Sequence, residues 1–171
     1  MMAPSIPRSE RTTQNRVVQL FTSSEAQSGL GYEYLGNLSQ RVDNRGIDID
    51  RLCASLQERR YSNAHITTAL QKLLAAADVS GVTPYEANQR TYQLLRYGIP
   101  VQVAAGKAHE TVALIDWEHP ERNHFALAEE VRLRGADDNT RRPDIVLYIN
   151  GMAMVVLELK RAGGSLRPIA E

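Results

Sequence analysis

The sequence predicts an α+β fold in which helices come first and strands follow. Apolar residues recur at helical spacing over most of residues 10–98, whereas short extended runs dominate after Pro100. Asn150-Gly151, between two apolar runs, is a strong signal for a β-hairpin. This order of elements argues against a repeating strand–helix–strand series.

Length and composition are typical of one soluble globular domain, residues 1–171. Of the 171 residues, 43% are hydrophobic and 23% charged, enough for a substantial core. No apolar run approaches the roughly 20 residues that span a bilayer, and the N-terminus lacks a signal-peptide pattern. A single cysteine, Cys53, excludes an intrachain disulfide. We therefore expect a cytoplasmic protein that does not contact the membrane.

The charge balance restricts how the chain meets DNA. Lys plus Arg and Asp plus Glu each number 20, so the formal net charge is zero. Phosphate neutralisation supplies most of the affinity of a DNA-binding protein, and such a protein is more often basic. A local patch, such as Arg141, Arg142 and Arg161 beside the hairpin, or another subunit would have to hold the duplex. A solvated charged face is the alternative.

The helical part begins with a helix near residues 10–22, for which Ser9 is an N-cap candidate. Residues 30–38 read as a turn and a short extended stretch. Three further helices are predicted in a helical segment of about residues 48–98. Thr83 and Pro84 are a good start for the last of these helices, and Gly98 is a stop signal.

Extended runs follow over about residues 100–160. They are short stretches near residues 101–105, 110–117 and 124–135, and then the hairpin "RRPDIVLYINGMAMVVLELKR". The closing "SLRPIAE" resembles the opening of a helix, so we expect the chain to be part of a longer protein.

The register of the hairpin decides where its charges lie. A two-residue turn would place Asp144 opposite Leu157, with Glu158 on the other face. A three-residue loop, residues 150–152, places Asp144 opposite Glu158 and on one face with Lys160. It also gathers apolar side chains on the opposite face: Ile145, Leu147, Ile149, Ala153, Val155, Leu157 and Leu159. We therefore predict the three-residue loop, in a hairpin covered on both faces.

Two neighbouring carboxylates need a shared cation. Lys160 supplies one solution, a simple ion-pair cluster. A divalent cation is the other, because Mg²⁺ prefers one or two carboxylates together with waters and phosphate oxygens. Asp144, Glu158 and the carbonyl of Leu159 would hold it, and Mn²⁺ would substitute. Such a site hydrolyses a phosphodiester, with Lys160 orienting water or stabilising charge on the phosphoryl oxygens.

These residues resemble the PD-(D/E)xK nuclease motif. Pro143 and Asp144 match its first part, and "ELK" at 158–160 matches its second. With "LGYEYLG", "ITTALQKLLAAA", "YQLLRYGIPV" and "VALIDWEHPERNHFALAEEV", the chain resembles the N-terminal nuclease domain of the restriction (R) subunit of type I restriction–modification enzymes. The resemblance covers nearly the whole chain.

The resemblance implies a restriction-endonuclease-like fold, a mixed sheet (αβββαβ) flanked by helices. The catalytic strands would lie near residues 124–134, 143–150 and 153–160, with the helical segment inserted before them. It implies a type I site-specific deoxyribonuclease acting on double-stranded DNA, with Asp144, Glu158 and Lys160 as catalytic residues. Partner subunits would recognise and methylate the site.

Nucleases of this superfamily often carry an extra acid. Glu10 on the first helix is the first candidate and Glu25 the second, and a solvated helix end is the alternative. Glu129 and Glu130 precede the motif, and one of them must face the Asp144 side or its reverse. Glu130 is retained as the second additional acid.

The resemblance also implies ATP use by motor domains. No G-x-x-x-x-G-K-[ST] loop occurs in this sequence, so we expect ATP to bind only to motor domains outside this chain. Two alternatives to the type I nuclease stay open. One is a non-enzymatic assembly or DNA-binding module of the same complex, in which the charges only form an ion pair. The other is a repair-type or junction-type nuclease with the same site and other partners.

Overall fold

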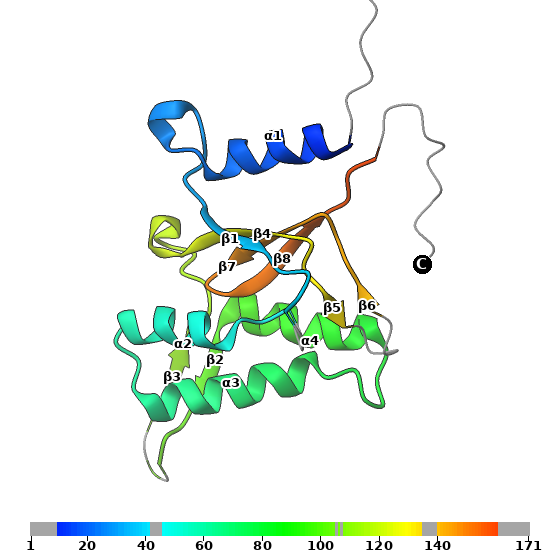
Figure 1. Ribbon diagram of the computed structural model, residues 1–171. Helices are drawn as coiled ribbons and strands as arrows, with labels where there is room; N and C mark the ends of the chain where they lie inside the picture. The colour runs from blue at the N-terminus through cyan, green and yellow to red at the C-terminus, as the bar shows by residue number, and fades with distance from the viewer. Residues whose placement is uncertain (1–9, 42–45, 105, 107, 135–139, 161–171) are drawn as a thin grey trace, which may run out of the picture.

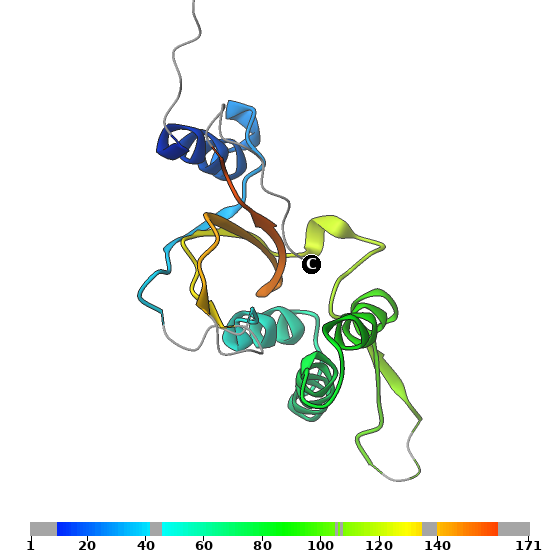
Figure 2. The same cartoon turned by 90° about the vertical axis from the view of Figure 1, so that its right-hand side faces the viewer.

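The computed structural model describes residues 10–41, 46–104, 106, 108–134 and 140–160. A four-stranded mixed sheet has helix α1 along one side, and helices α2–α4 lie on the opposite side of the molecule (Figures 1 and 2). In order of pairing, its strands are β1 (Glu33–Asn37), β4 (Phe125–Glu129), β7 (Ile145–Ile149) and β8 (Met152–Leu157). β1 runs parallel to β4, and the other two pairings are antiparallel.

The four predicted helices are all present. They are α1 (Glu10–Thr22), α2 (Ile49–Glu58), α3 (Asn63–Ala77) and α4 (Pro84–Tyr97). Local side chains define most of their starts, as at α4, where Thr83 and Glu86 form a reciprocal capping box. The N-cap candidate for α1, Ser9, lies outside the described residues. None of the helices described is both long and apolar enough to cross a membrane.

Two small sheets lie outside the four-stranded one. β2 (Ile99–Val101) pairs with β3 (Glu110–Val112), and β5 (Leu133–Arg134) pairs with β6 (Thr140–Arg141). Single-turn helices η1 (Glu25–Gln27) and η2 (Pro120–Arg122) occur in the connections. The predicted extended region from about residue 100 is therefore divided, and the central sheet takes its first strand from before the helical segment.

Three apolar clusters hold these elements together. The largest joins α2, α3, β2 and β3 to Met152 at the turn of the hairpin. A second lies on one face of the sheet around Val146 and Tyr148. The third packs Val17, Val18 and Phe21 of α1 against the other face. The two ends of the hairpin are thus supported by different parts of the chain, its turn by the helical segment and its open end by α1.

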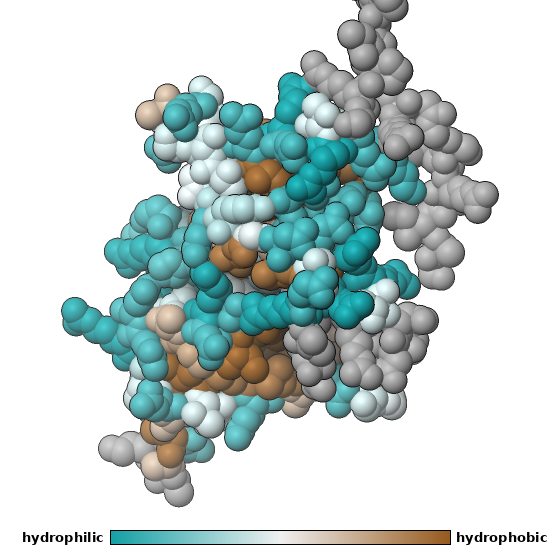
Figure 3. Space-filling model, in the orientation of Figure 1, coloured by the Kyte–Doolittle hydropathy of each residue, from teal (hydrophilic) through white to brown (hydrophobic). Residues whose placement is uncertain are grey.

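β8 is less covered than the sequence suggested. It is an edge strand of the described sheet, and Met154, Val155 and Val156 are 36%, 43% and 51% exposed. The prediction of a hairpin covered on both faces is therefore right for β7 and wrong for β8. Apolar surface is also visible over α2 and α3 (Figure 3).

Candidate active site at the open end of the hairpin

The hairpin turn differs from the predicted one. Ile149 pairs with Met152, so the turn has two residues, Asn150 and Gly151, and the three-residue loop is wrong. Both turn residues have positive φ, 50° and 82°, which is the backbone of a type I′ turn. The side chain of Asn150 reinforces it by accepting a hydrogen bond from the His124 amide (2.8 Å) and donating to the Leu114 carbonyl (2.9 Å).

A β-bulge then restores the predicted register at the other end. Tyr148 pairs with Ala153 but Leu147 pairs with Val155, so Met154 is the extra residue. From there to Ile145 and Leu157 the pairing follows the register expected from a three-residue loop. Continued by one residue, it places Asp144 opposite Glu158. The bulge also divides the predicted apolar face: Leu157 and Leu159 pack toward α1, whereas Ala153 packs on the opposite cluster.

Asp144 immediately precedes β7 and is held at several points. Its carboxylate Oδ2 accepts a hydrogen bond from the Leu159 amide at 2.6 Å. Its backbone carbonyl accepts from the Glu130 amide at 3.1 Å and from Gln14 Nε2 at 3.2 Å. These contacts orient a half-buried carboxylate toward the segment that carries Glu158.

Glu158 lies just beyond β8 among other charges. Its pKa is raised, first by partial burial of the carboxyl group and then by the negative charge of Asp144. Glu10 and Glu130 raise the same pKa, and Lys160 opposes the shift. The structure therefore brings the predicted triad and both retained additional acids close enough to interact electrostatically.

The remaining predicted residues are less well placed. Glu25 lies in η1, beyond the opposite end of α1 from Glu10 (Figure 1). Arg142 Nε pairs with Glu130 Oε2 at 3.0 Å, so this arginine already has an anionic partner. Arg141 is exposed on β6, and Arg161 lies outside the described residues.

Sequence reasoning missed Gln14 and the role of Glu129. Glu129 is 4% exposed on β4, and Gln14, on α1, is 3% exposed. Gln14 Nε2 donates to Glu129 Oε1 at 2.8 Å, although the two residues lie 115 positions apart. Local patterns carry no signal for such a pair, and only the docking of α1 reveals it.

The donor set suits a hard divalent cation in part. Asp144 and Glu158 are oxygen donors at the same end of the hairpin, as Mg²⁺ prefers. The Leu159 amide is used by Asp144, which leaves the Leu159 carbonyl as the further donor predicted from the sequence. In the part of the chain that the structure describes, no three His, Cys, Asp or Glu side chains form a metal-binding group. Waters and phosphate oxygens would have to complete the coordination.

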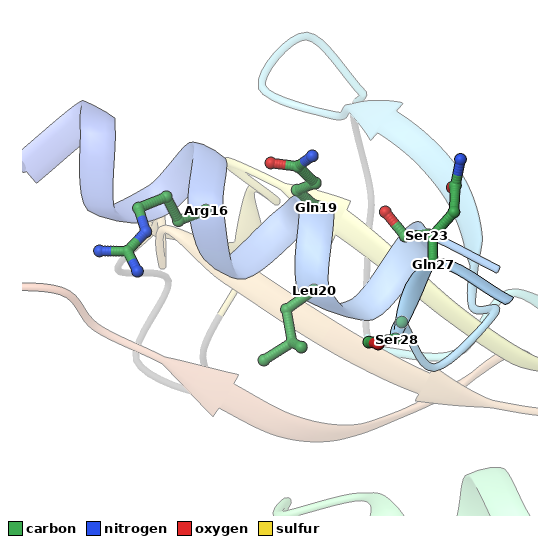
Figure 4. A pocket seen from close by; sticks show the side chains of 7 residues that line it. Arg16, Gln19, Leu20, Ser23, Gln27 and Ser28 are labelled. Carbon is green, nitrogen blue, oxygen red and sulfur yellow. The ribbon is translucent and has the colours of Figure 1, made fainter. Parts of the chain in front are cut away.

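Two small cavities lie elsewhere. One, of about 210 Å³, is lined by Arg16, Gln19 and Leu20 of α1 and by residues of the turn that follows (Figure 4). The other, of about 160 Å³, lies between α2 and the hairpin turn. Neither of these two cavities is lined by Asp144, Glu158 or Lys160.

Comparison with known proteins agrees with the resemblance seen in the sequence. The model of the type I restriction enzyme R protein N terminus matches residues 7–171. The HindI type I restriction enzyme endonuclease subunit of Haemophilus influenzae is 37% identical over 75 residues, 43% of this chain and 7% of that protein. A Methanocaldococcus jannaschii protein, provisionally named the type I restriction enzyme MjaVIIIP endonuclease subunit, is 29% identical over 104 residues, 59% of this chain and 9% of that one. The matches thus span less than a tenth of these relatives. The chain belongs to the family of type I restriction enzyme R protein N-terminal domains.

Proposed function

We propose that this chain is the Mg²⁺-dependent endonuclease domain of a type I restriction enzyme, with a restriction-endonuclease-like fold. The observation that carries the proposal is the bulged register of the hairpin, which brings Asp144 and Glu158 to one end of the sheet. Family membership supplies the reaction class, cleavage of DNA phosphodiester bonds. Double-stranded DNA is then the substrate, and the methylation and specificity subunits are partners. ATP hydrolysis belongs to motor domains outside this chain.

Each proposed site residue has a separate task. Asp144, Glu158 and the Leu159 carbonyl would hold the ion, which supplies Lewis-acid polarisation of the scissile phosphate. The Leu159 amide fixes one oxygen of Asp144 and leaves the other for binding. Lys160 places an ammonium group beside this end of the hairpin, where it stabilises negative charge on phosphoryl oxygens and orients the attacking water. Arg141 and Arg161 are proposed phosphate contacts.

The position of Lys160 supports a metal site over a closed ion-pair cluster. Among the residues with described side chains, Lys160 lies within 4.0 Å of no carboxylate oxygen, whereas other charged groups near the site, such as Arg142 and Glu130, do pair. Partial burial and then the charge of Asp144 raise the pKa of Glu158, and among the described residues no cationic side chain forms an ion pair with either carboxylate. A divalent cation would relieve that repulsion.

Calorimetric titration of Mn²⁺ into the purified chain tests the proposal. Mn²⁺ binds such oxygen sites more tightly than Mg²⁺, so its binding is easier to detect. We expect one site in the wild type and none in Asp144→Asn, which preserves the shape of the side chain. Asp50→Ala removes an exposed carboxylate at the start of α2 and serves as the matched control, with unchanged binding.

Lys160→Met separates binding from chemistry. We expect this variant to bind Mn²⁺ and, placed in a complete R subunit with its partner subunits, to lose DNA cleavage. If wild type and Asp144→Asn bind Mn²⁺ alike, or neither binds, the metal site is refuted and the assembly module is favoured. Cleavage by Lys160→Met at the wild-type rate would refute the role of the lysine.

A further inference from the structure

A polar cluster around the buried side chains of Glu129 and Gln14 ties α1 to the sheet beside the candidate site. Glu129 is its centre, with the amide of Gln14 donating to Oε1 at 2.8 Å. Arg11 Nη1 lies 3.2 Å from the same oxygen, and the Tyr34 hydroxyl donates to Oε2 in a short hydrogen bond. This bond to Glu129 is the main reason that the pKa of Tyr34 is raised. Burying a carboxylate is costly unless it is paired and hydrogen-bonded. Glu129 meets that requirement with groups from α1 and β1.

Gln14 makes a second contact that this packing does not require. Its Nε2 also lies 3.2 Å from the carbonyl of Asp144, which accepts a hydrogen bond from the Glu130 amide as well. Glutamine has two N–H donors on one nitrogen, so a single side chain can serve both acceptors. Glu129 thus orients the amide, and the amide contacts the peptide of Asp144.

The same helix carries Glu10 one turn earlier. Residues i and i+4 lie on the same helix face, so Gln14 and Glu10 both face the sheet end that holds the site. Glu10 acts electrostatically on Glu158. The contact from Gln14 therefore links α1, the helix that carries Glu10, to Asp144, the residue immediately before β7.

We propose that Gln14 is a positioning residue for the nuclease site. Its amide, oriented by Glu129, fixes the Asp144 peptide and through it the direction of the Asp144 carboxylate. This role rests on the proposed function of Asp144. A role in stability alone is the competing explanation, because buried hydrogen-bonded groups also stabilise the fold.

A double variant in which the side chains of Gln14 and Glu129 are swapped separates these two explanations. In Gln14→Glu two carboxylates face each other and the donor to Asp144 is lost, so both stability and Mn²⁺ affinity should fall. Adding Glu129→Gln reverses donor and acceptor: the amide at 129 donates to the carboxylate at 14, and Arg11 lies three residues from it on α1. The double variant should regain the unfolding temperature of the wild type. It still lacks a donor to the Asp144 carbonyl, so its Mn²⁺ affinity should stay about tenfold weaker.

A metal-independent measurement accompanies the titration. The Leu159 amide donates to Asp144 Oδ2, so its hydrogen-exchange rate, followed by NMR, reports the position of that carboxylate. We expect faster exchange at Leu159 in the double variant. The Tyr32 amide, which donates to the Phe21 carbonyl at the end of α1, is the control and should exchange as in the wild type.

The outcomes separate the two proposals. Recovery of both Mn²⁺ affinity and slow Leu159 exchange in the double variant would overturn the positioning role and leave the metal site standing. A wild type that binds no Mn²⁺, with Leu159 exchange still responding, would refute the metal site but keep Gln14 as the residue that positions Asp144. If the double variant does not regain the stability of the wild type, Gln14→Met tests the positioning role instead, because methionine is similar in size to glutamine but has no hydrogen-bond donor. Unchanged Leu159 exchange in that variant overturns the role.

Discussion

Replacing Asn150 tests how the hairpin is anchored. The residue is 1% exposed and has φ of 50°. Its side chain accepts from the His124 amide and donates to the Leu114 carbonyl and to Asn123 Oδ1, at 2.8, 2.9 and 2.9 Å. In Asn150→Ala each lost bond costs about 1 kcal/mol, and a methyl side chain at positive φ costs about 1 kcal/mol more. We expect a loss of about 4 kcal/mol, or about 10 °C in unfolding temperature for a chain of this length.

Urea unfolding followed by circular dichroism measures the loss, with an unchanged m-value as the sign that two-state unfolding persists. Asn150→Gly accepts the positive φ and isolates the hydrogen bonds, with an expected loss of about 3 kcal/mol. Asn37→Ala removes an exposed asparagine that accepts one hydrogen bond, from the Ser39 amide, and should cost at most about 0.5 kcal/mol. A loss in Asn150→Ala no larger than in Asn37→Ala would refute the anchoring role.

Three further predictions concern the site and its surroundings. The pKa of Glu158 is raised in the folded protein. The ionised carboxylate therefore destabilises the fold at a pH above this raised pKa, and the effect is absent at a pH below the pKa that Glu158 has in the unfolded chain. Glu158→Gln should raise the unfolding temperature at pH 7 but not at pH 3, and it should abolish Mn²⁺ binding. Solvent screening limits this gain to about 0.5 kcal/mol, and a lower unfolding temperature at pH 7 would contradict it. Thr83→Ala removes the capping box with Glu86 and should cost about 1 kcal/mol in urea unfolding, whereas Thr83→Ser should cost almost nothing. Gly98→Ala should be costlier than either, because φ is 77° and the new methyl group would lie 2.6 Å from Thr111 Cγ2; equal stability of Gly98→Ala and wild type would refute that geometry.

The sequence predicts the parts of this fold that depend on local chemistry. The bounds of α1 and the start of α4 at Thr83 and Pro84 follow from apolar spacing and capping, which involve residues at most a few positions apart. The apolar pattern also predicts the register at the open end of the hairpin, as far as Ile145 and Leu157, although with a turn that is wrong. The apolar pattern of the strands required the register, and it did not specify where the extra residue would lie.

Other features depend on contacts between distant segments. The β-bulge at Met154 has no distinctive residue to mark it. The exposure of β8 depends on which strands pair, and both faces of its sequence are apolar. Gln14 and Glu129 meet only because α1 docks across β4, so neither residue's neighbours in the sequence indicate the pair. In this protein, helix bounds and strand register follow from the sequence pattern, whereas contacts between distant segments do not.

The bulge at Met154 makes the two arms of the hairpin unequal in length. From the turn to Asp144 and to Glu158, the second arm has one residue more than the first, and the bulge takes up that residue. Deleting Met154 would therefore remove the bulge and still leave Asp144 opposite Glu158. Deleting one residue of β7 would instead raise the difference to two residues, which a single-residue bulge does not take up, so the two arms of the hairpin do not tolerate deletions equally.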